Sequence, residues 1–173
     1  AFFGCSKLEK ITFSGEDNLK IISQNAFEGC ALKGTLDFKS ICVISDYAFA
    51  GNSKLEVLNT SNTLLSIGEY AFAGCKKLHT VNIGSTKVKY GPYAFTDCEA
   101  LKEFTVNAAV LPEGMFYQCD SLTKVTVGKD VNMIGEFAFR ETKVDSFTVE
   151  AGNTVYKVQT ANHILSADGK TLY

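Results

Sequence analysis

The sequence predicts a mainly β solenoid in which about seven units of roughly 23 residues stack on one another. One phrase, Ala-Phe-x-Gly-Cys or a looser copy of it, recurs along the chain, and a short pattern of alternating apolar and polar residues follows most copies. The Phe of the phrase recurs at intervals of 25, 22, 23, 23, 21 and 23 residues. It occupies the positions of Phe2, Phe27, Phe49, Phe72, Phe95, Phe116 and Phe139.

Each unit continues from the phrase into a Leu-x-x-Val-x-Val segment, clearest at residues 78–83, 101–106 and 122–127. Residues 8–13 and 55–60 follow the pattern less closely. Alternation at the end of the segment predicts a short strand, and we expect these strands to pair as a parallel sheet. A second large apolar residue stands five positions before each Phe from the second copy onward. These residues are Ile22, Ile44, Ile67, Tyr90, Leu111 and Ile134.

One such unit cannot bury its apolar side alone, so the units must stack to form a continuous core. Stacking places Phe on Phe, with one ring in the middle of each turn, and each buried ring stabilises the stack by about 1.5–3 kcal/mol. The Gly of the phrase is expected to turn the backbone with a positive φ.

Residues 67–83 carry a resemblance to a known family. They match Ile-Gly-x-x-Ala-Phe-x-x-Cys-x-x-Leu-x-x-Val-x-Ile at every named position, which is similar to the unit of BspA-like leucine-rich-repeat proteins. The resemblance covers residues 1–150 and implies a right-handed leucine-rich-repeat solenoid with its parallel sheet on the concave side. Asn52 and Thr142 replace the Cys, Leu32 is displaced by one position, and Pro92 and Pro112 enter the segment before Phe. We expect local distortion in those units.

The chain is predicted to divide into a solenoid, residues 1–150, and a C-terminal cap, residues 151–173. Asp168-Gly169 stands between two apolar segments, residues 164–167 and 170–173, which is typical of a β-hairpin. Such a hairpin would cover the open edge of the last strand. The chain begins inside a unit and ends on Tyr173, inside the expected second strand, which indicates a fragment with a truncated cap.

Several function classes have no support in the sequence. The net charge of −2 and the absence of a basic run argue against a nucleic-acid partner. No apolar run reaches the roughly 18 residues that a membrane-spanning helix needs. No zinc-hydrolase, nucleophile-elbow or phosphate-loop motif is present. We therefore expect a non-enzyme with no catalytic, cofactor-binding or metal-binding residues.

The cysteines have two interpretations. Five of the six share one repeat position, which favours a column of buried free thiols. Their even number leaves a disulfide framework open as the alternative. The six are Cys5, Cys30, Cys42, Cys75, Cys98 and Cys119.

A ligand site, if the repeat forms one, should lie on the outward polar residues of the strands. One predicted column is Thr12, Asp37, Asn59, Asn82, Thr105, Thr126 and Thr148. The neighbouring column is Lys10, Thr35, Val57, Thr80, Glu103, Lys124 and Ser146. Neither contains the aromatic or Arg side chains that dominate binding hot spots. The candidate ligand-binding residues are Asn59, Thr80, Asn82, Glu103, Thr105, Lys124 and Thr126.

The resemblance implies a function only by analogy. Members of the family are secreted or cell-surface proteins, implicated in adhesion to host matrix proteins or to neighbouring cells. By that analogy the chain is an extracellular protein-binding or adhesion module with its ligand on the concave sheet. The alternative is a rigid spacer that presents another domain of the parent protein.

Overall fold

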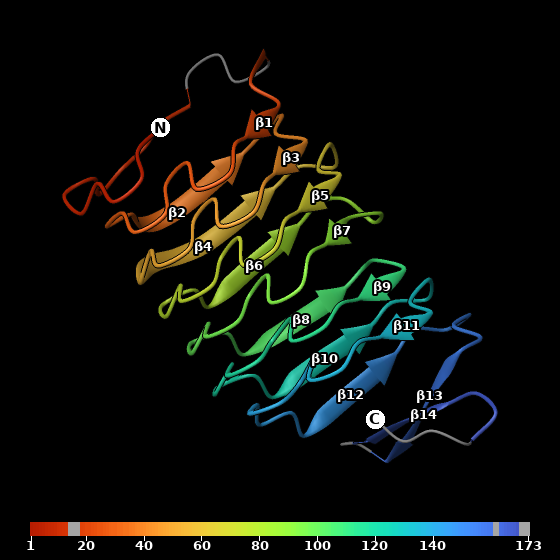
Figure 1. Ribbon diagram of the computed structural model, residues 1–173. Coiled ribbons are helices and arrows are strands. Elements are labelled where there is room, and N and C mark those ends of the chain that lie inside the picture. The colour runs from red at the N-terminus through yellow and green to blue at the C-terminus, as the bar shows by residue number, and fades with distance from the viewer. Residues whose placement is uncertain (14–17, 161–162, 170–173) are drawn as a thin grey trace.

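The computed structural model describes residues 1–13, 18–160 and 163–169, and these form a mainly β solenoid whose turns stack in one direction (Figure 1). The longer strands lie side by side and form what we call the main sheet. Its strands are β2 (Lys33–Phe38), β4 (Lys54–Thr60), β6 (Thr80–Ile83), β8 (Glu103–Val106), β10 (Lys124–Val127) and β12 (Ser146–Val149). All pairs within it are parallel, as the repeat predicts.

A second row of two-residue strands, the short-strand row, was not predicted. Each of these strands ends on the large apolar residue five positions before Phe, which is buried against the core. The row consists of β1 (Ile21–Ile22), β3 (Val43–Ile44), β5 (Ser66–Ile67), β7 (Lys89–Tyr90), β9 (Val110–Leu111) and β11 (Met133–Ile134). Its pairs are also parallel. Two residues are too few to show the alternation that identifies a strand from sequence.

The first unit lacks the expected strand. Residues 8–13 form no strand, although the carbonyl groups of Leu8 and Glu9 accept hydrogen bonds of 3.1 Å from the N–H groups of Ala31 and Lys33. Phe13 packs its ring 5.4 Å from that of Phe38, so the segment still covers the first main strand.

Stacked Phe rings form the centre of the core, as predicted. Successive centroids lie 5.3 Å apart from Phe2 through Phe27 and Phe49 to Phe72, and 5.5 Å apart between Phe72 and Phe95. The spacing widens to 6.3 Å between Phe95 and the next ring along the column. The ring stack is therefore regular up to Phe95 and loosens beyond it.

The phrase forms a backbone ladder beside this ring column. The N–H of each Phe donates to the carbonyl that precedes the next Phe, for example from Phe72 to Ala94 at 2.9 Å and from Phe95 to Met115 at 3.1 Å. The Gly of the phrase has the expected positive φ, as at Gly74 (69°). Asp97 takes the same left-handed conformation without being Gly (59°).

All six cysteines are free, so the disulfide framework is not formed. Four of the five thiols at the shared repeat position are buried, whereas Cys5 at the start of the column is exposed. The sequence did not indicate that these thiols donate hydrogen bonds. The Sγ of Cys98 lies 3.3 Å from the carbonyl oxygen of Phe72, one turn back, and Cys75 is placed likewise against Phe49 at 3.4 Å. Asn52 keeps this role where Cys is missing, because its Nδ2 donates to the Phe27 carbonyl at 2.8 Å.

Both sheets are interrupted at the same level (Figure 1). Neither β6 and β8 nor β7 and β9 are paired, while the phrase ladder continues past them. In the short-strand row the usual bond runs from Gly91 N–H to the Ile67 carbonyl at 2.8 Å. Pro112 takes the equivalent position one turn later and has no N–H to donate. The distortion expected at Pro112 is therefore present, whereas the unit of Pro92 keeps its pairing between β5 and β7.

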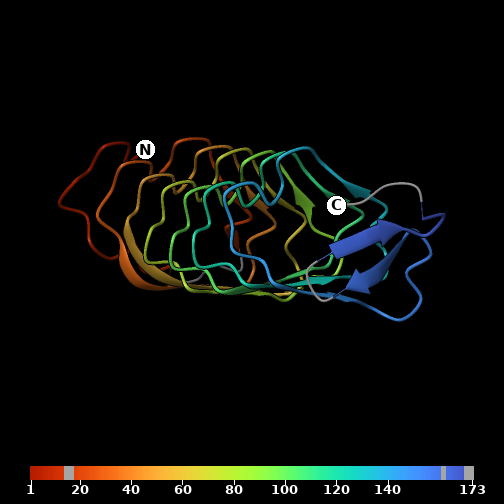
Figure 2. The same cartoon turned by 90° about the horizontal axis from the view of Figure 1, so that it is seen from below.

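A C-terminal hairpin follows the last main strand, as expected, but its pairing differs from the predicted one. Antiparallel strands β13 (Tyr156–Thr160) and β14 (His163–Ser166) form it and project at the end of the solenoid (Figure 2). Asp168-Gly169 comes after this hairpin rather than at its tip. The expected strand at residues 170–173 lies outside the described residues. Ile164 and Tyr156 are buried, which anchors the hairpin on the end of the core.

Candidate functional site

From β2 onward the two predicted polar columns lie on the main sheet in the expected register, except between β6 and β8, which do not pair. Lys10 and Thr12, the first members of the columns, lie in the first unit, which forms no strand. Asp37 pairs with Asn59 and Asn59 with Asn82, and beyond the break Thr105, Thr126 and Thr148 follow one another in the same way. The register follows from the repeat, because the units of β2 to β10 have six residues from the Cys position to the central apolar residue of the strand. The last unit has five, from Thr142 to Phe147, and keeps the pairing of Val125 with Phe147.

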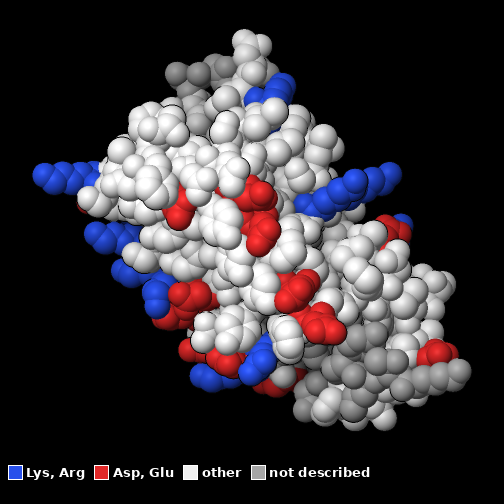
Figure 3. Space-filling model, viewed as in Figure 1, with Lys and Arg blue, Asp and Glu red and all other residues white. Residues whose placement is uncertain are grey.

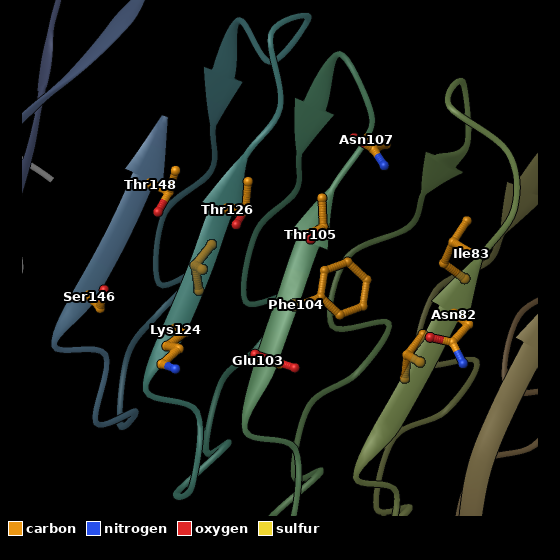
Figure 4. Close-up of a pocket in the computed structure, with 12 residues that line it drawn as sticks. Asn82, Ile83, Glu103, Phe104, Thr105, Asn107, Lys124, Thr126, Ser146 and Thr148 are labelled. Carbon is orange, nitrogen blue, oxygen red and sulfur yellow. The ribbon is translucent and has the colours of Figure 1, made fainter. Parts of the chain in front are cut away.

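The seven candidate residues divide into two groups. Asn59 and Thr80 lie on β4 and β6, and the Oδ1 of Asn59 accepts a hydrogen bond of 2.8 Å from the Nδ2 of Asn82. The other five line a cleft of about 460 Å³ in the main sheet (Figure 4). They are Asn82, Glu103, Thr105, Lys124 and Thr126.

The cleft spans β6, β8, β10 and β12, so it lies across the break between the two halves of the sheet. Asn107, Ser146 and Thr148 add further polar groups to its lining. Glu103 and Lys124 are its charged residues, and both are exposed on neighbouring strands in direct register. Its volume is that of an ordinary ligand site, and hydroxyl, amide and ionised groups outnumber apolar ones around it.

Bulky aromatic residues underlie this place in the sheet. Phe104 takes the position that Leu58 and Val125 hold in other turns, and its ring lies 4.9 Å from Phe116 and 5.4 Å from Phe95. Tyr90 takes the position of an Ile and approaches Phe104 at 6.2 Å. Both larger rings are buried in the core at the turn where the main sheet is interrupted.

Tyr90 carries an unusual polar atom. Its hydroxyl is buried and has no hydrogen-bond partner within the described part of the chain. Burial raises the pKa of Tyr90, so the phenol stays neutral. An unpaired buried hydroxyl costs about 1–3 kcal/mol, which marks the break as a strained part of the solenoid.

The face shown in Figure 3 differs from the main sheet. Asp and Glu gather along its middle, and many of the Lys side chains lie at its edge. Tyr47, Tyr70 and Tyr93 stack in successive turns at 5.1 and 5.0 Å. The hydrogen bond from Tyr93 to Glu113 (2.7 Å), together with burial, raises the pKa of Tyr93 to about 12. This tyrosine row was not predicted, although Tyr two residues before Phe is visible in the sequence at three adjacent units.

Across residues 1–13, 18–160 and 163–169, no three His, Cys, Asp or Glu side chains gather as a metal ion would require. None of the described segments forms a helix with the length and apolarity needed to cross a bilayer.

The profile of the BspA type leucine rich repeat region matches residues 1–102 and 42–162, in six copies. The chain belongs to the BspA-type leucine-rich-repeat family. No curated protein matches it.

Solved structures of bacterial leucine-rich-repeat proteins resemble this BspA-type chain. The leucine rich repeat protein of T. pallidum is 27% identical, with a TM-score of 0.56 over 62% of this chain and 52% of that one. A leucine-rich repeat protein from Eubacterium ventriosum is 18% identical, with a TM-score of 0.58 over 78% of this chain and 42% of the other. A leucine rich cell surface protein from Faecalibacterium prausnitzii is 20% identical, with a TM-score of 0.54 over 87% and 48%. The chain therefore spans about half the length of these proteins, and the last two likenesses concern the fold alone.

Proposed function

We propose that this BspA-type chain is a non-enzymatic protein-binding module that takes its ligand in the cleft of the main sheet. The observation that carries the proposal is the convergence of five candidate side chains, from three strands, on one cavity of about 460 Å³. Repeat solenoids present extended sheet surfaces to partners, and the cleft is a hollow of about 460 Å³ in this one. By family analogy the partner is a surface or matrix protein of a host or a neighbouring cell, and the parent protein is secreted or held at the cell surface.

The polarity of the cleft supports a protein partner rather than an apolar small molecule, because hydroxyl and amide groups need partners of their own on binding.

The test is a binding panel of host matrix proteins, glycans and cell-surface preparations, run with the chain and two fourfold variants. The cleft variant replaces four lining residues by Ala: Asn82, Glu103, Thr105 and Lys124. The control replaces four exposed residues outside the cleft by Ala: Glu69, Lys89, Glu113 and Glu136.

Saturable binding that only the cleft variant loses is the expected result. If only the control variant loses binding, the cleft is not the site. The ligand would then bind on the side of the tyrosine row. Absence of saturable binding in every arm would favour the spacer, whose rigidity the unbroken phrase ladder and Phe column support.

A further inference from the structure

The break in the main sheet leaves two strand edges facing one cleft. β6 is the last strand of the order β2-β4-β6, and β8 is the last strand of the order β12-β10-β8. Where the strands of successive turns do pair, backbone bonds continue just past their ends. An example is the bond from Gly84 N–H, after β6, to the carbonyl of Thr60 on β4, at 3.1 Å. Within the described residues no backbone bond joins 78–84 to 101–107. Backbone donors and acceptors on both edges are therefore available to another strand.

Apolar side chains beside this edge are also incompletely covered. The core-facing residues of β6, Val81 and Ile83, are partly exposed. Leu58, the partner of Val81 on β4, is fully buried, whereas Thr60, the partner of Ile83, is partly exposed as well. Both side chains of β6 line the cleft. A strand placed next to β6 could cover them with its own apolar residues.

The polar side of the same gap carries a negative charge. Glu103 is exposed at the edge of β8. On its other side β8 already has a neighbour of opposite charge, because Lys124 of β10 stands in register with Glu103. A basic residue in the gap would repeat that arrangement on the open side of Glu103.

We propose that the gap between β6 and β8 binds an extended peptide segment as an inserted strand. The segment pairs its backbone with both edges, directs alternate apolar residues toward Val81 and Ile83, and places a basic residue beside Glu103. Addition of a strand to a free sheet edge is a general mode of peptide recognition. The inference rests on the proposed function, since it names the kind of ligand that the cleft of the main sheet takes.

The two halves of the solenoid remain joined along the phrase ladder, which lets the gap adjust its width. The bonds from Phe95 to Met115 and from Asp97 to Tyr117 hold this side together at 3.1 and 2.8 Å. Pro112 keeps the short-strand row open, because it lacks the N–H that closes the row elsewhere.

The probe is a fluorescein-labelled peptide with the sequence of residues 121–128, Ser-Leu-Thr-Lys-Val-Thr-Val-Gly. This is the strand that already pairs with the far edge of β8, and it has the required alternation and basic residue. Two variants carry N-methyl groups on alternate amides, one at the positions of Lys124 and Thr126, the other at those of Val125 and Val127. Each set removes the donors that face one side of a strand and leaves every side chain unchanged. Binding to the whole chain is followed by fluorescence anisotropy.

Insertion predicts that both N-methylated peptides bind at least about tenfold more weakly than the parent, because both of its edges are paired. If only one set weakens binding, the peptide adds to a single free edge, and the inference is wrong. Equal binding by all three peptides, or no binding of the parent peptide up to millimolar concentration, overturns it as well.

A protein variant provides the second arm. Pro112→Gly restores the missing N–H, and we expect it to close the gap. Amide exchange in β8 should then become slower, and the chain should bind the parent peptide at least about tenfold more weakly. Slower exchange with unchanged peptide binding would contradict the inference. The binding panel tests the proposed function separately. If a partner no longer binds the fourfold cleft variant but binds the Pro112→Gly variant as well as the parent chain, the proposed function stands and strand insertion is wrong.

Discussion

The buried Asn52 offers the sharpest test of how the turns are held together. It stands in the Cys column, is fully buried, and makes three hydrogen bonds to backbone groups. Its Nδ2 donates to the carbonyls of Phe27 and Phe49, both at 2.8 Å. Its Oδ1 accepts the N–H of Leu32 at 3.1 Å. The displaced Leu32 is the reason for the third bond, because its buried N–H has no backbone partner among the described residues.

The cost of Asn52→Ala follows from what each group loses. The N–H of Leu32 is left buried and unpaired, at about 1–3 kcal/mol. The Phe27 carbonyl keeps only a long bond of 3.4 Å from Cys30 N–H and loses about 0.5–1.5 kcal/mol. The Phe49 carbonyl still accepts from the Cys75 thiol at 3.4 Å and loses less. The variant should therefore lose about 2–5 kcal/mol of unfolding free energy.

Two matched substitutions isolate the bond to Leu32. Cys98→Ala removes one thiol donor from the same column and should cost about 1 kcal/mol. Asn52→Cys restores the thiol of the repeat but leaves Leu32 with a weak acceptor, so its cost should lie between the other two. Urea unfolding followed by circular dichroism gives the three free energies, and amide exchange at Leu32 reports the local bond. A loss for Asn52→Ala no greater than that for Cys98→Ala would refute the reasoning.

Three further predictions concern stability. Tyr90→Phe removes an unpaired buried hydroxyl, so it should leave the urea midpoint unchanged or raise it; a fall would show that the hydroxyl has a partner. Gly91→Ala should cost about 1–3 kcal/mol, because its Cβ would lie 2.4 Å from the backbone N of Glu69, and urea unfolding without measurable loss would contradict that overlap. Burial raises the pKa of the Cys75 and Cys119 thiols to about 12, while unfolded thiols ionise near pH 9. The thiols' contribution to the unfolding free energy should therefore be fully present below about pH 9, and it should fall by about 1.4 kcal/mol per thiol per pH unit up to about pH 12. Cys75→Ala should make this fall less steep in urea titrations at about pH 8 to 11.

The parts of the structure that repeat were predictable from the sequence. A fixed period places equivalent residues above one another, so the Phe column, the thiol column and the polar columns followed directly from spacing. The sequence also identified Pro112 and Pro92 as departures, but it could not separate their effects. Pro92 occupies the position of Glu69, whose N–H bonds to the Asp46 side chain and takes no part in the ladder. Pro112 occupies the position of Gly91, whose N–H closes the short-strand row.

The cleft could not be predicted because it arises where neighbouring turns fail to match. The repeat pattern assumes that each strand pairs with the next, and on that assumption Asn82 and Thr105 are adjacent members of one column. In the structure they lie on opposite sides of the break. Likewise Val81 and Ile83 have the pattern of buried residues but are partly exposed in the structure, where β8 does not pair with their strand.

The unit between Phe95 and Phe116 concentrates the departures that produce the cleft. It is the shortest interval, with 21 residues, and its loop from β8 to β9 has three residues where those from β6 to β7 and from β10 to β11 have five. This unit loses the strand pairing with the turn before it, yet it retains the phrase ladder and gains Phe104 packed between Phe95 and Phe116. Ring pairs of this kind contribute about 0.5–1.5 kcal/mol each beyond their buried area, which offsets part of the lost pairing. Aromatic packing thus lets the solenoid stay continuous on one side while its main sheet stays open on the other. An open sheet edge is a template for pairing with another chain, and the segment proposed for this one is a strand.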